Sequence, residues 1–175
     1  MTEFDPVEAL RVLERHRVSY VVIGALAAAA SGAPIVTRDL DITPSRDHAN
    51  LGRLAMALRE LGARLRTPSD PEGIAFPVDA DMLAEAGIWT LMTSAGELDL
   101  VFQPAGTRGF DDLSRDASRL SIGEGVHVPV ASLADVVRSK EASARAKDLA
   151  QLPLLRQTLE RVRERERQRA VDPDI

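Results

Sequence analysis

Apolar residues recur along the chain with two periods, about 3.6 residues and two residues, which predict helices and short strands. A first helix is expected from Asp5, where Asp5 can cap it, Pro6 suits the first turn and Glu8 completes a capping box. Apolar stripes and bounding glycines predict the next segments: a strand over 19–23, a helix over 25–30 after Gly24, a strand over 36–43, and a helix over 47–61 that ends at Gly62.

The pattern becomes less regular in the second half of the chain. Residues 66–79 are rich in proline and acidic side chains, so we expect mostly loop there, followed by a short helix over 81–86. Two hairpins are expected, one joining strands 88–94 and 97–103 and one within 121–130. From Ser132 the chain is expected to be helical, with a break or restart at Pro153.

These elements predict an α+β (α/β mixed) fold class, with a small twisted mixed sheet flanked by helices and a helical C-terminal part. The length of 175 residues suits one domain with a real core. We expect residues 1–130 to form this core. Residues 131–175 are expected to form a helical segment packed on it, giving a single compact unit.

Composition narrows the classes of protein. Apolar residues make up 45% and charged residues 28%, a globular balance, and the lack of cysteine excludes disulfides and thiolate metal sites. The net charge of −5 excludes a globally basic nucleic-acid footprint. We interpret the Arg- and Glu-rich stretch 156–169 as a solvated helix, and the alternative is a nucleic-acid contact. With no membrane-spanning apolar stretch and an acidic N-terminus unlike a secretory signal, we expect a cytoplasmic protein.

Asp39 and Asp41 are the first candidates for chemistry. On a strand, alternate side chains share a face, so both carboxylates should point one way while Leu40 and Ile42 point to the core. Neighbouring carboxylates repel each other unless a positive charge lies between them, and a divalent cation such as Mg²⁺ or Mn²⁺ prefers such oxygen ligands. The alternative for this short pattern is a pair of solvated carboxylates.

Asp99 adds a third carboxylate on another expected strand. Leu98, Leu100 and Phe102 should face the core, which leaves Asp99 on the opposite face with Glu97. If this strand lies beside Asp39 and Asp41, the three aspartates form a metal site of the kind used for phosphoryl and nucleotidyl transfer. The alternative is that Asp99 lies on the solvent-exposed face of an edge strand.

Three segments together resemble a known family. They are Ile23-Gly24-Ala25-Leu26-Ala27, Thr37-Arg38-Asp39-Leu40-Asp41-Ile42, and the stretch 140–149 with the sequence KEASARAKDL. This order of parts resembles the DNA polymerase β-type nucleotidyltransferase superfamily, and most closely its minimal AbiE-type toxin nucleotidyltransferases. The resemblance covers roughly residues 18–152 and implies the nucleotidyltransferase fold.

The resemblance also implies roles for particular residues. Asp39, Asp41 and Asp99 would be the catalytic and metal-binding residues, with Mg²⁺ or Mn²⁺ as cofactor and Asp99 activating the acceptor hydroxyl. The nucleotide-binding residues would lie in the glycine turn, beside the aspartates and in the later helix: Gly24, Ala25, Arg38, Lys140, Lys147 and Asp148. Lys147 would lie on nearly the same helix face as Lys140. The alternative for these last three residues is surface charge and a local ion pair of Asp148 with Arg145 or nearby lysines.

One position departs from the family pattern and leaves two functions open. The family usually has Gly-Gly or Gly-Ser in the turn, whereas this chain has Gly24-Ala25. We expect a metal-dependent nucleotidyltransferase that moves a nucleoside monophosphate (NMP) from a nucleoside triphosphate (NTP) to a hydroxyl of RNA or protein, as a component of a toxin–antitoxin pair with an antitoxin partner. The alternative is a catalytically weak or inactive member that acts as a partner-binding module.

Overall fold

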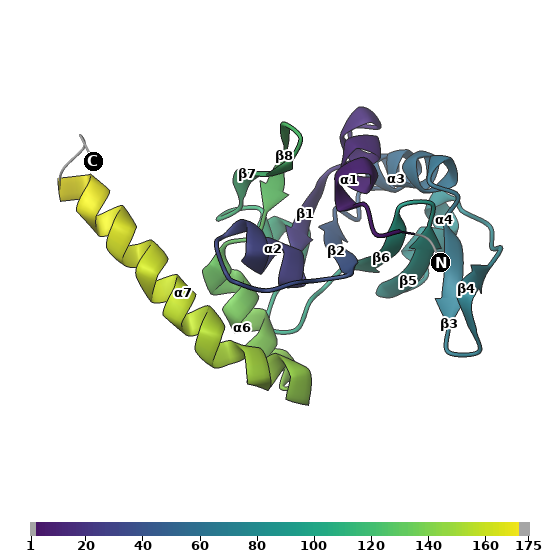
Figure 1. The fold of residues 1–175 in the computed structure, drawn as a ribbon. Helices are drawn as coiled ribbons and strands as arrows, with labels where there is room; N and C mark the ends of the chain where they lie inside the picture. The colour runs from purple at the N-terminus through teal and green to yellow at the C-terminus, as the bar shows by residue number, and fades with distance from the viewer. Residues whose placement is uncertain (1–2, 172–175) are drawn as a thin grey trace.

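A computed structural model describes residues 3–171, which form seven helices and one eight-stranded sheet (Figure 1). The helices are α1 (Pro6–Arg15), α2 (Gly24–Ala30), α3 (His48–Glu60), α4 (Ala80–Ala84), α5 (Phe110–Leu113), α6 (Leu133–Ser143) and α7 (Ala146–Val171). The strands are β1 (Tyr20–Ile23), β2 (Asp39–Pro44), β3 (Arg64–Thr67), β4 (Asp70–Ile74), β5 (Ile88–Thr93), β6 (Gly96–Val101), β7 (Ser118–Gly123) and β8 (Val126–Val130).

The sheet is mixed and has the strand order β4-β3-β5-β6-β2-β1-β8-β7. β2 pairs with β6 in parallel, β1 pairs with β8 in parallel, and the other neighbours are antiparallel. This arrangement confirms the expected α+β class with a mixed sheet. It also brings together in the middle of the sheet the two strands on which the candidate aspartates were expected.

The core has the apolar faces that the sequence pattern predicts. Leu40 and Ile42 of β2 are 1% and 0% exposed, and Leu98 and Leu100 of β6 are equally buried. The stripes of the first helix and of α3 are buried as well, and Asp5 caps α1 by accepting a hydrogen bond from the Glu8 amide at 3.0 Å. Because these leucines and Ile42 point to the core, the polar residues that alternate with them must point to the other face.

The prediction of a loop over residues 66–79 is wrong for residues 66–74, because residues 64–74 form the β3–β4 hairpin. Pro71 is tolerated in β4 because that strand lies at the edge of the sheet. On the outer side of an edge strand, a backbone N–H has no neighbouring strand to bind, so proline loses no hydrogen bond there. The expected strand over 36–43 also begins later than predicted, at Asp39, and Val36 is 92% exposed. Residues 36–38 therefore belong to the connection that leads into β2.

The C-terminal helices break at a different place from the one predicted. α6 ends at Ser143, Ala144 adopts the left-handed conformation with φ of 50°, and α7 begins at Ala146, whereas Pro153 lies inside α7. One lost backbone hydrogen bond at Pro153 is tolerated because Leu152 and Leu155, on either side of it, are buried. Within residues 3–171, no helix is long and apolar enough to span a bilayer.

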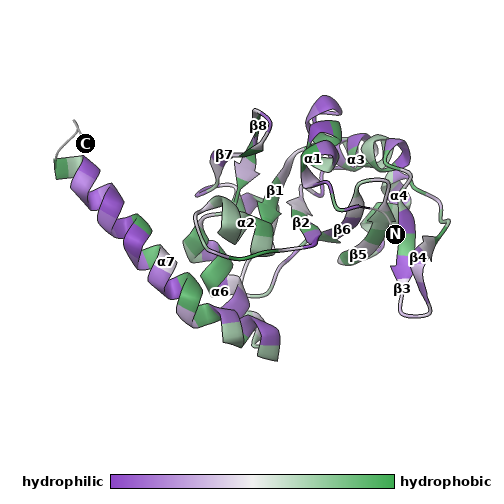
Figure 2. Ribbon diagram, in the orientation of Figure 1, coloured by the Kyte–Doolittle hydropathy of each residue, from purple (hydrophilic) through white to green (hydrophobic). Residues whose placement is uncertain are grey.

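The two halves of α7 differ in their surroundings. The first half carries the buried residues of the helix, whereas the residues after Thr158 are mostly exposed, charged and hydrophilic (Figure 2). Figure 1 shows this second half extending away from the sheet, as expected for a solvated helix. Residues 172–175 of the expected C-terminal segment lie outside the described residues.

Candidate active site

Four carboxylates share one face of the central β2–β6 pair. Asp39 is the register partner of Glu97, and Asp41 is the register partner of Asp99. Residues in register on neighbouring strands have side chains on the same face. The strand alternation predicted from the sequence is therefore what the structure has, and it places three aspartates and one glutamate in two adjacent rows.

Gly24 lies directly against one of these carboxylates. It is the first residue of α2 and has φ of 68°, a conformation that side chains rarely adopt. A Cβ atom built on Gly24 would overlap Asp41 Oδ2 and would lie 3.2 Å from Asp41 Cγ. The glycine is therefore needed both for the backbone turn between β1 and α2 and for the close approach of the Asp41 side chain.

The charge of Asp41 is poorly compensated. Burial, followed by the neighbouring charges of Asp39 and Asp99, raises the pKa of the Asp41 carboxyl, and Lys147 and Lys140 lower it; the net result is a pKa of about 7. Burial also raises the pKa of Asp99, although Arg66 acts in the opposite direction. A group of carboxylates that is partly shielded from water and repels itself is an oxygen-donor site that a divalent cation would stabilise.

The outer carboxylates have protein partners. Thr37 donates a hydrogen bond to Asp39 Oδ1. Arg66 of β3 forms ion pairs with Glu97 Oε2 at 2.5 Å and with Asp99 Oδ1 at 3.2 Å. Among residues 3–171, no three carboxylate or histidine side chains lie close enough together to hold an ion in this arrangement. Three-ligand binding would therefore need side-chain rotations at Asp39 or Asp99, where Thr37 and Arg66 are the groups to be displaced.

A second cluster of charged residues surrounds Asp148. Its buried carboxylate accepts hydrogen bonds from Lys140 Nζ at 2.8 Å, Ser143 Oγ at 2.5 Å and Arg145 Nε at 2.7 Å. Burial alone would raise the pKa of Asp148, but these three hydrogen bonds hold it well below its usual range. The local ion pair with Arg145 that the sequence allowed is present, and Asp148 also fixes the Lys140 side chain.

The expected position of Lys147 on the same helix as Lys140 is wrong. Lys140 belongs to α6, and Lys147 belongs to α7, which begins after the left-handed residue Ala144. Lys147 is exposed, yet it contributes to the electrostatic environment of Asp41. The two lysines thus face the carboxylates from two helices rather than from one helix face.

A single cleft of about 810 Å³ connects these groups. All nine residues proposed from the sequence line it: Gly24, Ala25, Arg38, Asp39, Asp41, Asp99, Lys140, Lys147 and Asp148. The structure therefore brings together the glycine turn, the aspartates of two strands and the basic residues of α6 and α7.

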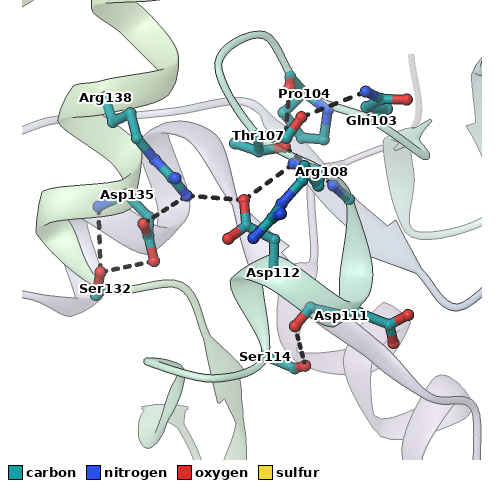
Figure 3. Close-up of polar contacts among 11 residues, drawn as sticks. Gln103, Pro104, Thr107, Arg108, Asp111, Asp112, Ser114, Ser132, Asp135 and Arg138 are labelled. Carbon is teal, nitrogen blue, oxygen red and sulfur yellow. Dashed lines mark hydrogen bonds and ion pairs between the residues drawn. The ribbon is translucent and has the colours of Figure 1, made fainter.

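One wall of the cleft is fixed by a polar network between α5, α6 and the loop that follows β6 (Figure 3). Arg138 Nη2 bridges Asp112 Oδ2 at 3.1 Å and Asp135 Oδ1 at 2.8 Å, and Asp112 also accepts from the Arg108 amide at 2.9 Å. Asp135 and nearby Pro104 both line the cleft. The network holds this wall against α6, which carries Lys140.

Sequence reasoning missed Thr37, Ser143 and especially Arg66 as neighbours of the site. Ser143 and Arg145 lie inside the segment 140–149 that carries the family resemblance, so the sequence does indicate that they are close to Asp148. No sequence signal points to Arg66, because it reaches Glu97 and Asp99 from a hairpin that the sequence predicts as a loop. Its position depends on the strand order, in which β5 alone separates β3 from β6.

No protein-family model and no curated protein sequence matches this chain. Among solved structures, the antibiotic-resistance factor ANT(2'')-Ia matches with a TM-score of 0.54 and 14% identity, over 95% of this chain and 91% of that one. A Thermotoga maritima protein provisionally classed as a nucleotidyltransferase matches with a TM-score of 0.48 and 18% identity, over 91% of this chain and 97% of that one. The likeness to ANT(2'')-Ia shows that the chain has the nucleotidyltransferase fold.

Proposed function

We propose that this protein is a metal-dependent nucleotidyltransferase that moves an NMP from an NTP to a hydroxyl group, with release of pyrophosphate. The observation that carries the proposal is the in-register pair Asp41 and Asp99, in a cleft whose other side presents Lys140 and Lys147. Such a cleft can hold a cation at the carboxylates and a triphosphate at the lysines at the same time. The fold shared with ANT(2'')-Ia agrees with this reading.

Asp39, Asp41 and Asp99 are the residues that would hold Mg²⁺ or Mn²⁺. The fit rests on the donor set: three oxygen-bearing side chains on one face, with the pKa of Asp41 raised to about 7 by burial and by its acidic neighbours. When bound, the cation supplies charge stabilisation at the reacting phosphate and at the acceptor oxygen. Asp99, at the edge of the carboxylate group nearest β5, is the base proposed to take the proton of the acceptor hydroxyl.

The triphosphate would lie between the start of α2 and the basic residues. Gly24 and Ala25 offer backbone amides at a helix end that lacks a side-chain cap. Lys140 would neutralise phosphate charge, and Asp148 would orient Lys140 through their 2.8 Å ion pair. Lys147 and Arg38, both exposed at the cleft, would add further positive charge.

The acceptor would bind beside Asp99, where β5 and β6 line the cleft with mostly uncharged side chains. Thr90 is the register partner of Asp99, and Ile88, which is 60% exposed, is the register partner of Val101; all of these residues line the cleft. An RNA acceptor would bring phosphates next to the Asp99 carboxylate and the uncharged side chains of Thr90, Ile88 and Val101, whereas a protein hydroxyl would bring no such charge. Of the two acceptors, this surface favours a protein side chain, and a protein acceptor also suits a toxin–antitoxin role in which the acceptor is a bound partner.

The test is incubation of the protein with each α-³²P-labelled NTP, Mg²⁺, and total cellular RNA or total cellular protein. The proposal expects label in one fraction, dependent on Mg²⁺ and lost in Asp41→Asn and Asp99→Asn. Label that persists in both variants would refute the metal assignment. Tight NTP binding without transfer to any fraction would instead favour the partner-binding module, for which Ala25 in the turn is the relevant departure.

A further inference from the structure

We propose that Arg66 is a positioning residue that competes with the divalent cation for Asp99 and thereby sets the affinity of the site for metal. This inference rests on the proposed function, because it assumes that Asp39, Asp41 and Asp99 hold the cation. It adds a fourth participant to the site that comes from a distant hairpin and from outside the segments that carry the family resemblance.

The geometry places the guanidinium where it can act as a substitute cation. Arg66 Nη2 lies 3.2 Å from Asp99 Oδ1, and Nη1 lies 2.5 Å from Glu97 Oε2. The Arg66 side chain is only 24% exposed, and its buried Nε atom has no hydrogen-bond partner within the described residues. A buried donor without a partner is costly, so the contacts with the two carboxylates are the ones that hold this side chain over the sheet.

The backbone of Arg66 is fixed, whereas its guanidinium has a second position available. The Thr90 hydroxyl donates to the Arg66 carbonyl at 3.1 Å, and β3 pairs with β5 through Leu65 and Leu91. Glu97 is 37% exposed and already bound by Nη1. Rotation of the side chain toward Glu97 would therefore release Asp99 while keeping the guanidinium paired with a carboxylate.

This arrangement accounts for the separation of the carboxylates. Arg66 draws Asp99 Oδ1 toward β3, and Thr37 holds Asp39, so that among residues 3–171 three ligand side chains do not lie within reach of one ion. Binding of a cation to all three aspartates must then displace the Arg66 contact with Asp99. Removal of the guanidinium should make metal binding tighter, in contrast to a residue that merely orients a ligand, whose loss makes binding weaker.

The first experiment measures the dissociation constant for Mn²⁺ by electron paramagnetic resonance, without nucleotide. Arg66→Met should bind Mn²⁺ roughly three- to tenfold more tightly than the unmodified protein. Arg64→Met is the matched control, because Arg64 lies on the same strand but donates to the Gly73 carbonyl instead of to a site carboxylate. Asp41→Asn should abolish the binding and so identify the site.

The second experiment measures the unmodified protein and uses a variant only to assign one signal. Arginine side-chain ¹⁵N signals are recorded while Mg²⁺ is added to the unmodified protein, and the Arg66 signal is assigned by its loss in Arg66→Lys. The inference expects a shift of the Arg66 signal that saturates with the metal, because its guanidinium leaves Asp99.

The outcomes separate the inference from the proposed function. Unchanged or weaker Mn²⁺ binding in Arg66→Met, or an Arg66 signal that does not move on saturation with Mg²⁺, would overturn the role of Arg66 and leave the proposed function standing. A lack of any Mn²⁺ binding by the unmodified protein at millimolar concentration would overturn both. If Arg66→Met fails to fold, the Mg²⁺ titration of the unmodified protein decides.

Discussion

Replacement of Asp41 by asparagine should stabilise the protein in the absence of divalent cations. Burial, Asp39 and Asp99 all disfavour the charge on Asp41, so its pKa is raised from 3.8 to about 7. Asparagine has nearly the same shape and carries no charge. The variant should therefore keep the packing of Asp41 against Gly24 and remove the repulsion.

The size and pH dependence of this effect follow from the pKa. Because the folded-state pKa lies above the unfolded one, the folded state holds the proton more tightly, and stability is lost as pH rises from about 4 through about 7. The difference between the folded-state and unfolded-state pKa of Asp41 corresponds to a loss of ~4 kcal/mol of folding stability at most. The loss is about 2 kcal/mol when water and salt screen the charges. Asp41→Asn should match the original protein near pH 4 and exceed its stability most above pH 7.

The assay is thermal or urea unfolding from pH 4.5 to 8 with a chelator present, followed by the fluorescence of Trp89, which is the only tryptophan and is buried against Phe76. We expect the melting temperature of Asp41→Asn to exceed that of the original protein by roughly 4 to 16 °C at pH 8, with the difference shrinking toward low pH. A difference that stays constant over this pH range would refute the argument that Asp41 is a buried carboxyl with a raised pKa.

Three further predictions test other parts of the cleft. Gly24→Ala should lose about 1–3 kcal/mol of stability and also Mn²⁺ affinity in a binding titration, whereas Gly62→Ala, with a similar φ of 60° and open space around it, should lose only stability. Lys140→Met should lower the affinity for NTP at least tenfold in calorimetry. It should also cost about 1.5–3 kcal/mol of stability in urea unfolding, because it removes one of the three hydrogen-bond donors to buried Asp148. In acid unfolding, Asp148→Asn should be less stable than the original protein above pH 4, and the stability difference should shrink at lower pH. The reason is that the pKa of Asp148 is lowered in the folded state, so its stabilising charge is lost only as pH falls. A stability difference that is the same at all pH values would contradict this.

Local patterns allowed much of the site to be predicted from the sequence. Alternation of Asp39 with Leu40 and of Asp99 with Leu98 requires only that the segments be strands with one buried face, and the structure has that face. Gly24 could be predicted in the same way, since a glycine between a buried strand and a helix indicates a tight turn. The pairing of β2 with β6, by contrast, was only a hypothesis until the strand order was known.

The parts that could not be predicted depend on long-range packing. Arg66 reaches Asp99 because only β5 separates β3 from β6 in the sheet. The prolines and acidic residues around its hairpin predict a loop instead. The break between the two lysines is set by Ala144 in the left-handed conformation, stabilised by the contacts of Ser143 and Arg145 with Asp148. Proline usually signals such a break, and here Pro153 lies within α7, because buried leucines hold the helix on both sides of it.

The most direct test of a metal and nucleotide site in this cleft is the melting temperature with Mg²⁺ and a non-hydrolysable NTP, added singly and together. At a ligand concentration of about 100 times the dissociation constant, we expect a stabilisation of ~2.7 kcal/mol, or roughly 5 to 11 °C. The shift should be larger with both ligands together than with either one alone, and it should be absent in Asp41→Asn. No shift at saturating concentrations of both, or an equal shift in Asp41→Asn, would contradict the account.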